Sequence, residues 1–291
     1  SDPHAARTHA LNLKTNCKPT DINIDPFEFI RSITDERPEE AVDVIVGGPP
    51  CQTFARVGRA KMRAESQRQD CWTARAGLYE RYIAYVKALK PLVIVLENVP
   101  DILHYQGRNV ADEICQLLGE EYDATCTLLN AVNYGVPQFR ERLYLVAFHK
   151  SLQVKWEWPS PTHLSQVPNG YRDIRAFARR QKRGQIVERD PLHTDLAAGQ
   201  KLKAAVSVQR ALQDLPKIYA IEEYAAGNLG RLSQKLGLEK PYAGKALTNY
   251  AEQMREWPEL QTHKTVTAHV IRCLPRDFRI FARMEQGDHY P

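Results

Sequence analysis

The segment that most constrains this chain is an apolar run at residues 42–46 that ends in Gly-Gly-Pro-Pro-Cys-Gln at residues 47–52. A short run rich in β-branched residues is typical of a buried strand, and the glycines and prolines after it end that strand in a stiff turn. Such a turn would hold the thiol of Cys51 at the carboxyl end of a strand, where open α/β sheets bind their ligands. Cys51 is therefore a candidate nucleophile; the alternative is a small residue buried in a tight turn.

Two further apolar runs adjoin polar residues. The run at 91–96 leads directly into Glu97, and Arg140 and Arg142 stand two positions apart before the run at 143–148. Side chains at i and i+2 of an extended chain point to the same side, so the two arginines could clamp an anionic or carbonyl-bearing ligand. Taken singly, Glu97 is better interpreted as a solvated loop residue, and the arginines could form an ordinary basic turn.

In this order and spacing the three motifs resemble those of the cytosine-5 DNA methyltransferase family. Residues 50–52 (Pro-Cys-Gln) are similar to its nucleophile motif, residues 97–99 (Glu-Asn-Val) to its acid motif, and residues 138–142 (Gln-Phe-Arg-Glu-Arg) to its Gln-x-Arg-x-Arg motif. The flanking sequence at residues 129–138 also resembles that of the family. The resemblance is specific over about residues 21–148, and it implies a Rossmann-like methyltransferase that uses S-adenosylmethionine as methyl donor.

The resemblance also implies a separate chemical role for each motif residue. Carbon 5 of cytosine becomes nucleophilic only after a thiolate adds to carbon 6, and the family pattern gives this attack to Cys51. Glu97 would hydrogen-bond or protonate N3 of the ring. Arg142, supported by Arg140, would stabilise the charge that develops at O2. A stacked base cannot reach such a pocket, so the target cytosine would be flipped out of the duplex.

Part of a cofactor site is expected by the same resemblance. Asp21 and Ile22 are similar to the pair that reads the adenine of S-adenosylmethionine, and Pro50 and Leu78 would pack against this cofactor. The family's glycine-rich loop should precede these residues, and its last motifs should follow Pro291. We therefore expect a fragment truncated at both ends, and expect this fragment alone to bind S-adenosylmethionine poorly or not at all.

Apolar runs alternate with helical stretches such as 77–90, which predicts an α/β fold with a doubly wound, mostly parallel sheet. We expect residues 1–150 to form the catalytic domain and residues 151–268 the target recognition region, which is polar and irregular. Residues 269–291 would start the return to the catalytic domain. The Trp-Glu-Trp-Pro-Ser-Pro segment at 156–161 marks the domain boundary, as a hinge or a packing anchor.

The net charge of +5 is mild for a protein that binds DNA, so the distribution of charge is more informative. One basic cluster, at 56–63, follows the nucleophile motif directly, and for this cluster phosphate contact is the favoured interpretation. A second cluster, at 172–183, is equally compatible with a solvated face.

Other classes of site receive no support from the sequence. None of the six cysteines forms a Cys-x-x-Cys pair or stands at zinc spacing from histidines, so neither a metal nor a disulfide framework is expected. His163, His193 and His263 are interpreted as surface residues rather than as ligands. No stretch approaches the ~20 apolar residues of a membrane span, and a reduced cytoplasm is the expected home of a free catalytic thiol.

The predicted function is methylation of carbon 5 of cytosine in double-stranded DNA, by a monomeric modification enzyme that is paired with a restriction endonuclease or acts alone. One alternative is a cytosine-5 methyltransferase of transfer RNA, against which the long second domain argues. The other is a non-catalytic DNA-binding relative, against which the intact Cys51, Glu97, Arg140 and Arg142 argue.

Overall fold

The computed structural model describes residues 2–49 except positions 16, 18 and 39, together with residues 78–104, 108–164, 202–217, 238–255 and 265–269, and a few isolated positions beyond residue 217. Contacts divide this part of the chain into two units. The first contains the described residues up to 130 and residues 140–161, and the second contains residues 131–139, 162–164 and those from 202 onward. Several predicted features lie outside the described residues: Pro50, Cys51, both basic clusters, His193 and His263.

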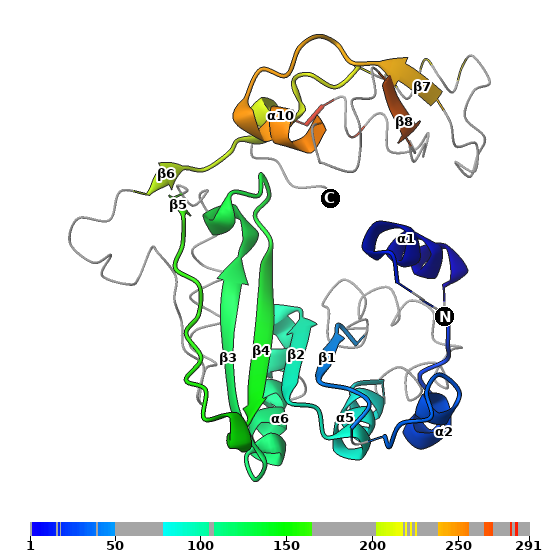
Figure 1. Ribbon diagram of the computed structural model, residues 1–291. Coiled ribbons are helices and arrows are strands. Elements are labelled where there is room, and N and C mark those ends of the chain that lie inside the picture. The colour runs from blue at the N-terminus through cyan, green and yellow to red at the C-terminus, as the bar shows by residue number, and fades with distance from the viewer. Residues whose placement is uncertain are drawn as a thin grey trace. The chain divides into compact units, whose positions relative to one another are not determined.

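Four strands form the sheet of the first unit, in the order β1–β2–β4–β3 (Figure 1). They are β1 (Val44–Gly47), β2 (Val93–Asn98), β3 (Tyr122–Asn130) and β4 (Glu141–His149). β1 and β2 run parallel, with Gly47 opposite Leu96, whereas β4 is antiparallel to both β2 and β3. The described sheet is therefore mixed, with a parallel pair on one side and an antiparallel pair on the other.

Three of the four described helices of the first unit begin at a side-chain cap. The four helices are α1 (Pro3–Leu13), α2 (Pro26–Arg31), α5 (Leu78–Leu89) and α6 (Val110–Leu118), with short 3-10 turns η1 (Pro100–His104) and η3 (Lys150–Leu152). The capped helices are α1, α2 and α6. In α1 and α2 an aspartate precedes the first proline and accepts two backbone N–H groups of the first turn. This arrangement satisfies donors that have no partner inside the helix.

One hydrophobic core joins α5 and α6 to the sheet. The apolar residues of each helix recur at helical spacing on one face, and that face is buried. Their side chains meet those of β2 and β4, where Ile94, Leu96, Leu143 and Leu145 are fully buried. Burying each such side chain stabilises the fold by about 1.5–3 kcal/mol, so the core fixes the positions of the strand ends that carry the motifs.

The second unit consists of short elements. The strands β5 (His163–Leu164) and β6 (Lys203–Ala204) pair in parallel, and β7 (Leu238–Pro241) pairs antiparallel with β8 (Thr265–His269). The helices are α8 (Val208–Leu212) and α10 (Asn249–Arg255), and a 3-10 turn η2 (Ala131–Tyr134) follows β3 along the chain.

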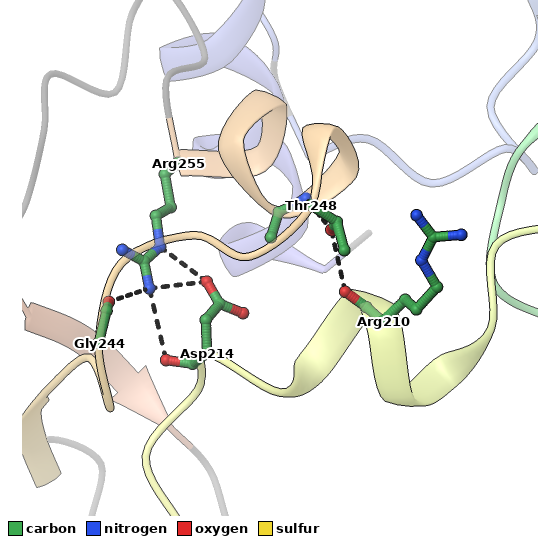
Figure 2. Close-up of polar contacts among 6 residues, drawn as sticks. Arg210, Asp214, Gly244, Thr248 and Arg255 are labelled. Carbon is green, nitrogen blue, oxygen red and sulfur yellow. Dashed lines mark hydrogen bonds and ion pairs between the residues drawn. The ribbon is translucent and has the colours of Figure 1, made fainter.

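A buried ion pair connects α8 to α10, as Figure 2 shows. Arg255 Nε donates to Asp214 Oδ2 at 2.7 Å, and Arg255 Nη2 donates to the carbonyl oxygen of Gly244 at 2.9 Å. The guanidinium also lies over the ring of Tyr242, 3.7 Å from its centroid. Thr248 Oγ1 donates to the carbonyl oxygen of Arg210 at 3.0 Å, which fixes the start of α10 against α8.

Several predicted elements are confirmed. The helical stretch at 77–90 contains α5, and the run at 143–148 lies within β4. The strand predicted at 42–46 is present but begins two residues later, as β1. It is not the buried strand predicted there, because Val44 and Val46 are 51% and 73% exposed. The aromatic segment acts as a packing anchor, because Trp158 is buried and its ring lies 5.7 Å from that of Trp156, at nearly a right angle.

His163, predicted as a surface residue rather than a ligand, makes a close contact with Gly135 that the sequence did not indicate. This side chain is half-buried, and its ring lies so close to Gly135 that a Cβ there would be 2.9 Å from His163 Cε1. Gly135 has φ +89°, a conformation that favours glycine. The Thr162 N–H donates to the carbonyl oxygen of Asn133 at 2.9 Å, so β5 brings His163 onto the turn. A surface assignment could not foresee this contact between distant segments.

Candidate active site

The ends of β1 and β2 bring two of the sequence motifs together. The parallel register continues from the pair Gly47–Leu96, so the loop after β1 runs beside the end of β2. A Cβ on Gly48 would lie 3.2 Å from Glu97 Oε2, which places the loop against this carboxylate. Pro49 is buried there, and Cys51 follows two residues later, outside the described part of the chain.

The start of β4 adds the third motif. Arg142 Nε lies 3.0 Å from Glu97 Oε1, and the two side chains remain 21% and 39% exposed. Arg142 Nη1 also donates to the carbonyl oxygen of Glu141 at 2.6 Å. An ion pair this exposed contributes only about 0–1 kcal/mol to stability. The pair therefore holds an acid and a cation side by side at little energetic benefit to the fold.

Arg140 is placed differently from Arg142. Its side chain is exposed and stands just before β4, while its backbone N–H donates to Oδ1 of the buried Asn130 at 3.0 Å. Of the two arginines, Arg142 makes the ion pair with Glu97. The role predicted for Arg140 remains a prediction.

Asn98 is a residue whose role the sequence reasoning missed. Its side chain is 2% exposed, its Nδ2 donates to the carbonyl oxygen of Pro49 at 3.3 Å, and its Oδ1 accepts from the Val99 N–H at 2.9 Å. Asn98 thus ties the loop that leads to Cys51 to the end of β2. The available signal was an amide at the end of an apolar strand, because a buried amide must find hydrogen-bond partners.

Tyr82 of α5 bonds to the two strands that lead to this site. Its hydroxyl donates to the carbonyl oxygens of Ile45 and Val95, at 3.3 and 3.0 Å, and so joins β1 to β2. Burial raises the pKa of Tyr82 far above its usual value, which keeps the hydroxyl protonated. A Cβ on Gly47 would lie 2.4 Å from Tyr82 Cε2, so only glycine fits at the end of β1.

A cavity of about 780 Å³ lies beside β1 and reaches this loop. We name it the Asp21 cavity. Three of the four predicted cofactor residues, Asp21, Ile22 and Leu78, line it, and the fourth, Pro50, lies outside the described residues. The rest of its wall is mainly apolar and comes from α2, β1 and α5: Phe29, Ile30, Ile33, Val44, Ile45, Val46, Tyr82, Tyr85 and Leu89.

The rim of the Asp21 cavity is a folded turn. Oδ1 of Asp21 accepts from both the backbone N–H and the Nδ2 of Asn23, each at 3.0 Å. Tyr85 of α5 donates to the carbonyl oxygen of Ile24 at 3.1 Å, and its ring packs edge-on against Phe29 at 6.2 Å. These contacts hold the exposed Asp21 carboxylate at the edge of an otherwise apolar pocket.

The described part of the chain contains no group of three His, Cys, Asp or Glu side chains that could hold a metal ion. The helices in that part are also too short or too polar to span a membrane.

Comparison with known proteins identifies the family. The family model of C-5 cytosine-specific DNA methylase matches residues 1–268. The chain belongs to this family. It is 32% identical over 251 residues to M.OihORF3336P of Oceanobacillus iheyensis, which carries the name of a type II methyltransferase, and the match covers 85% of this chain and 52% of that protein. It is 28% identical over 223 residues to the type II methyltransferase M.AquIA of Picosynechococcus, covering 73% of this chain and 84% of M.AquIA.

A solved structure supports the fold. A prophage-encoded protein of E. coli, described as a DNA modification methyltransferase, superposes with a TM-score of 0.53 at 21% identity, over 87% of this chain and 55% of that one. This likeness confirms the predicted α/β methyltransferase fold. The chain spans about half the length of this structure and of M.OihORF3336P.

Proposed function

We propose that the protein containing this chain transfers a methyl group from S-adenosylmethionine to carbon 5 of cytosine in double-stranded DNA. The observation that carries the proposal is the contact between Glu97 and Arg142 beside the Gly48–Pro49 loop, at the edge of the Asp21 cavity. An acid, a cation and a loop leading to a thiol thus converge next to a pocket of cofactor size.

The ring chemistry assigns a task to each of these groups. The Cys51 thiolate forms a bond to carbon 6, and the electron pair of the 5,6 double bond becomes available at carbon 5. Glu97 in its protonated form donates to N3 and offsets the charge that the adduct places on the ring. Arg142 donates to O2 and stabilises the same charge. After methylation, loss of the carbon 5 proton and breakage of the S–C6 bond restore the aromatic ring and the thiolate.

The Asp21 cavity has the chemistry that S-adenosylmethionine requires. Its apolar walls suit a flat adenine ring, and the Asp21 carboxylate at its rim suits the donors of the adenine edge. Ile22 and Leu78 would pack against the cofactor, and Pro50 would close the side next to the nucleophile. When bound there, S-adenosylmethionine supplies an electrophilic methyl group.

The names of the relatives support a modification enzyme as the biological setting. M.OihORF3336P and M.AquIA are both named as type II methyltransferases. On this basis the protein would act in the cytoplasm, as a monomer on duplex DNA, and a restriction endonuclease of the same system would be its partner.

The complete open reading frame, expressed in a host without cytosine methylation, tests the proposal. Sequencing that host's DNA with single-base detection of 5-methylcytosine should find methylation in one short recurring motif. A matched Cys51→Ser protein should leave the DNA unmethylated while still binding it. Soluble protein without any DNA methylation would contradict the proposal, and methylation of transfer RNA in the same cells would identify the alternative substrate.

A further inference from the structure

A second cavity of the first unit lies at the other end of the sheet. It encloses about 720 Å³ between the end of α6, the start of β3 and the segment that follows β4. Tyr122, which lines it, pairs with His149, whereas the active-site end of β4 pairs Arg142 with Leu129. Seven residues along a strand span about 23 Å. We name it the Tyr122 cavity, and it is separate from both the Glu97–Arg142 pair and the Asp21 cavity.

Tyr122, which lines this cavity, has a buried hydroxyl without a partner in the described part of the chain. The Tyr122 side chain is 3% exposed, and its hydroxyl makes no hydrogen bond there. The ring is held edge-on against the ring of His149 at 5.4 Å. Burial raises the pKa of Tyr122 to about 12, so the hydroxyl remains a donor at neutral pH. An unsatisfied buried polar group costs about 1–3 kcal/mol, which a ligand that bonds to it would recover.

An aromatic platform forms the wall of the cavity. The ring of Trp156 is held at 5.6 Å from Phe148 and at 5.7 Å from the buried Trp158, yet its side chain is 39% exposed. A tryptophan that is fixed on two sides and partly open to solvent is a suitable surface for a planar ring, because stacking requires little further ordering.

The charged side chains of the cavity differ in how far they already bond within the protein. Lys150 also lines it, but its Nζ donates to the carbonyl oxygens of Gly119 and Glu120, at 2.6 and 3.0 Å. Lys155 is exposed on the rim next to Trp156, and Asp123 is an exposed carboxylate on the same lining. The lining therefore carries two cations and one anion, which favours a ligand of low negative charge over a polyanion.

We propose that the Tyr122 cavity binds a planar heteroaromatic anion of nucleotide size. Its ring stacks on Trp156, an acceptor on its edge receives the Tyr122 hydroxyl, and its anionic group lies near Lys155. A volume of about 720 Å³ is in the range of pockets that enclose small molecules. The inference concerns a site that methyl transfer does not use, so it does not depend on the proposed function.

Fluorescence titration of the 291-residue chain with guanosine 5′-monophosphate tests the site. The probe carries a ring with an acceptor edge and a phosphate, and the variants described below distinguish binding in the Tyr122 cavity from binding in the Asp21 cavity. We expect saturable quenching of tryptophan emission at submillimolar to millimolar probe. Guanosine, which lacks the phosphate, and ribose 5-phosphate, which lacks the ring, should both bind more weakly.

Three variants of the cavity and one control variant separate this site from binding elsewhere. Trp156→Leu removes the stacking surface and should weaken binding about tenfold or more. Tyr122→Phe removes the hydroxyl and should weaken it about fivefold, while its thermal unfolding midpoint stays equal to that of the parent or rises. Lys155→Gln should weaken binding about threefold, and Lys87→Gln, an exposed lysine of α5 outside the cavity, should leave it unchanged.

Two outcomes would overturn the proposal. One is the absence of saturable quenching at millimolar probe by the folded parent chain. The other is equal affinity of Trp156→Leu and the parent, which would place any bound nucleotide at another site. If Trp156→Leu fails to fold, Tyr122→Phe decides, because it preserves the packing of the ring.

Discussion

The Glu97–Arg142 pair of the first unit and the Asp214–Arg255 pair of the second unit differ in what remains accessible. In the first unit, Glu97 and Arg142 share one contact of 3.0 Å, and Glu97 is 39% exposed. In the second unit, Asp214 is 3% exposed, and Arg255 bonds to it at 2.7 Å and to the Gly244 carbonyl oxygen (Figure 2). The same guanidinium lies over the face of Tyr242. The first pair keeps donors and acceptors for another molecule, whereas the second uses most of its capacity inside the fold.

Because the two pairs differ in exposure, substitutions in them should affect activity and the free energy of unfolding differently. Removing one partner of a buried pair leaves a desolvated charge and is strongly destabilising, whereas an exposed pair contributes little to stability. Substitutions in the first pair should therefore change activity with little effect on unfolding. Substitutions in the second pair should change unfolding first.

The largest expected effect is on turnover. Glu97→Gln in the complete protein should reduce the rate of methyl transfer about 10²–10⁴-fold, because the amide cannot protonate N3. Its free energy of unfolding should fall by less than about 1 kcal/mol, since the lost ion pair is partly exposed. Radiolabelled methyl transfer and thermal unfolding of the same preparation measure both quantities.

Glu121→Gln is the matched control, because Glu121 pairs with Lys90 at 3.1 Å with similar exposure and lies away from the motifs. It should leave turnover unchanged. A Glu97→Gln enzyme with parental turnover would remove Glu97 from the chemistry.

The next largest effect is on stability. Asp214→Ala leaves the Arg255 guanidinium without its carboxylate and should lower the free energy of unfolding by about 3 kcal/mol. Hydrogen exchange of the α10 amides should accelerate in parallel. Glu40→Ala, which breaks the exposed Arg37–Glu40 contact of 3.9 Å, should change neither quantity. Equal exchange in Asp214→Ala and the parent would show that this pair does not hold α10.

Substitution of Asn98 should change both turnover and stability. Asn98→Leu keeps the side-chain volume but removes the bonds to the Pro49 carbonyl oxygen and the Val99 N–H, and should cost about 2 kcal/mol of stability. Turnover should fall at least tenfold, because the loop that carries Cys51 loses its attachment to β2. A variant that loses stability with unchanged turnover would limit Asn98 to packing.

The smallest expected effect concerns Tyr242. Tyr242→Leu removes the aromatic face from Arg255 and should cost about 1 kcal/mol, the usual size of a partly exposed cation–π contact. Tyr242→Phe keeps the face and should be close to neutral in the same unfolding measurement. Equal losses in both variants would assign the effect to the hydroxyl.

Much of the first unit was predictable because its signals are local. Apolar runs that end in Gly, Pro or Glu place the motifs at strand ends, and the helical spacing before β2 predicts α5. The grouping of Asp21, Ile22 and Leu78 around one cavity agrees with the family resemblance. The roles of Cys51, Glu97, Arg140 and Arg142 remain predictions, and Cys51 lies outside the described residues.

The remaining contacts could not be predicted because their partners are distant along the chain. Arg255 and Asp214 are separated by 41 residues of mostly polar sequence, and nothing in either local pattern identifies the other. The same is true of His163 with Gly135, and of the Asn98 amide with the Pro49 carbonyl oxygen. Such pairs depend on which backbones the fold brings together.

The mixed sheet has a consequence for the order in which the protein folds. β3 and β4 are joined by residues 131–140, whereas β1 and β2 are joined by residues 48–92. Closing the longer loop costs more conformational entropy before any contact repays it, so we expect the β3–β4 ladder to form first and the β1–β2 ladder later. Pulse-labelling hydrogen exchange should protect Cys126 and Leu145 amides before those of Val95 and Leu96. The candidate active site at the ends of β1 and β2 would then form last, against a β3–β4 ladder that has already formed.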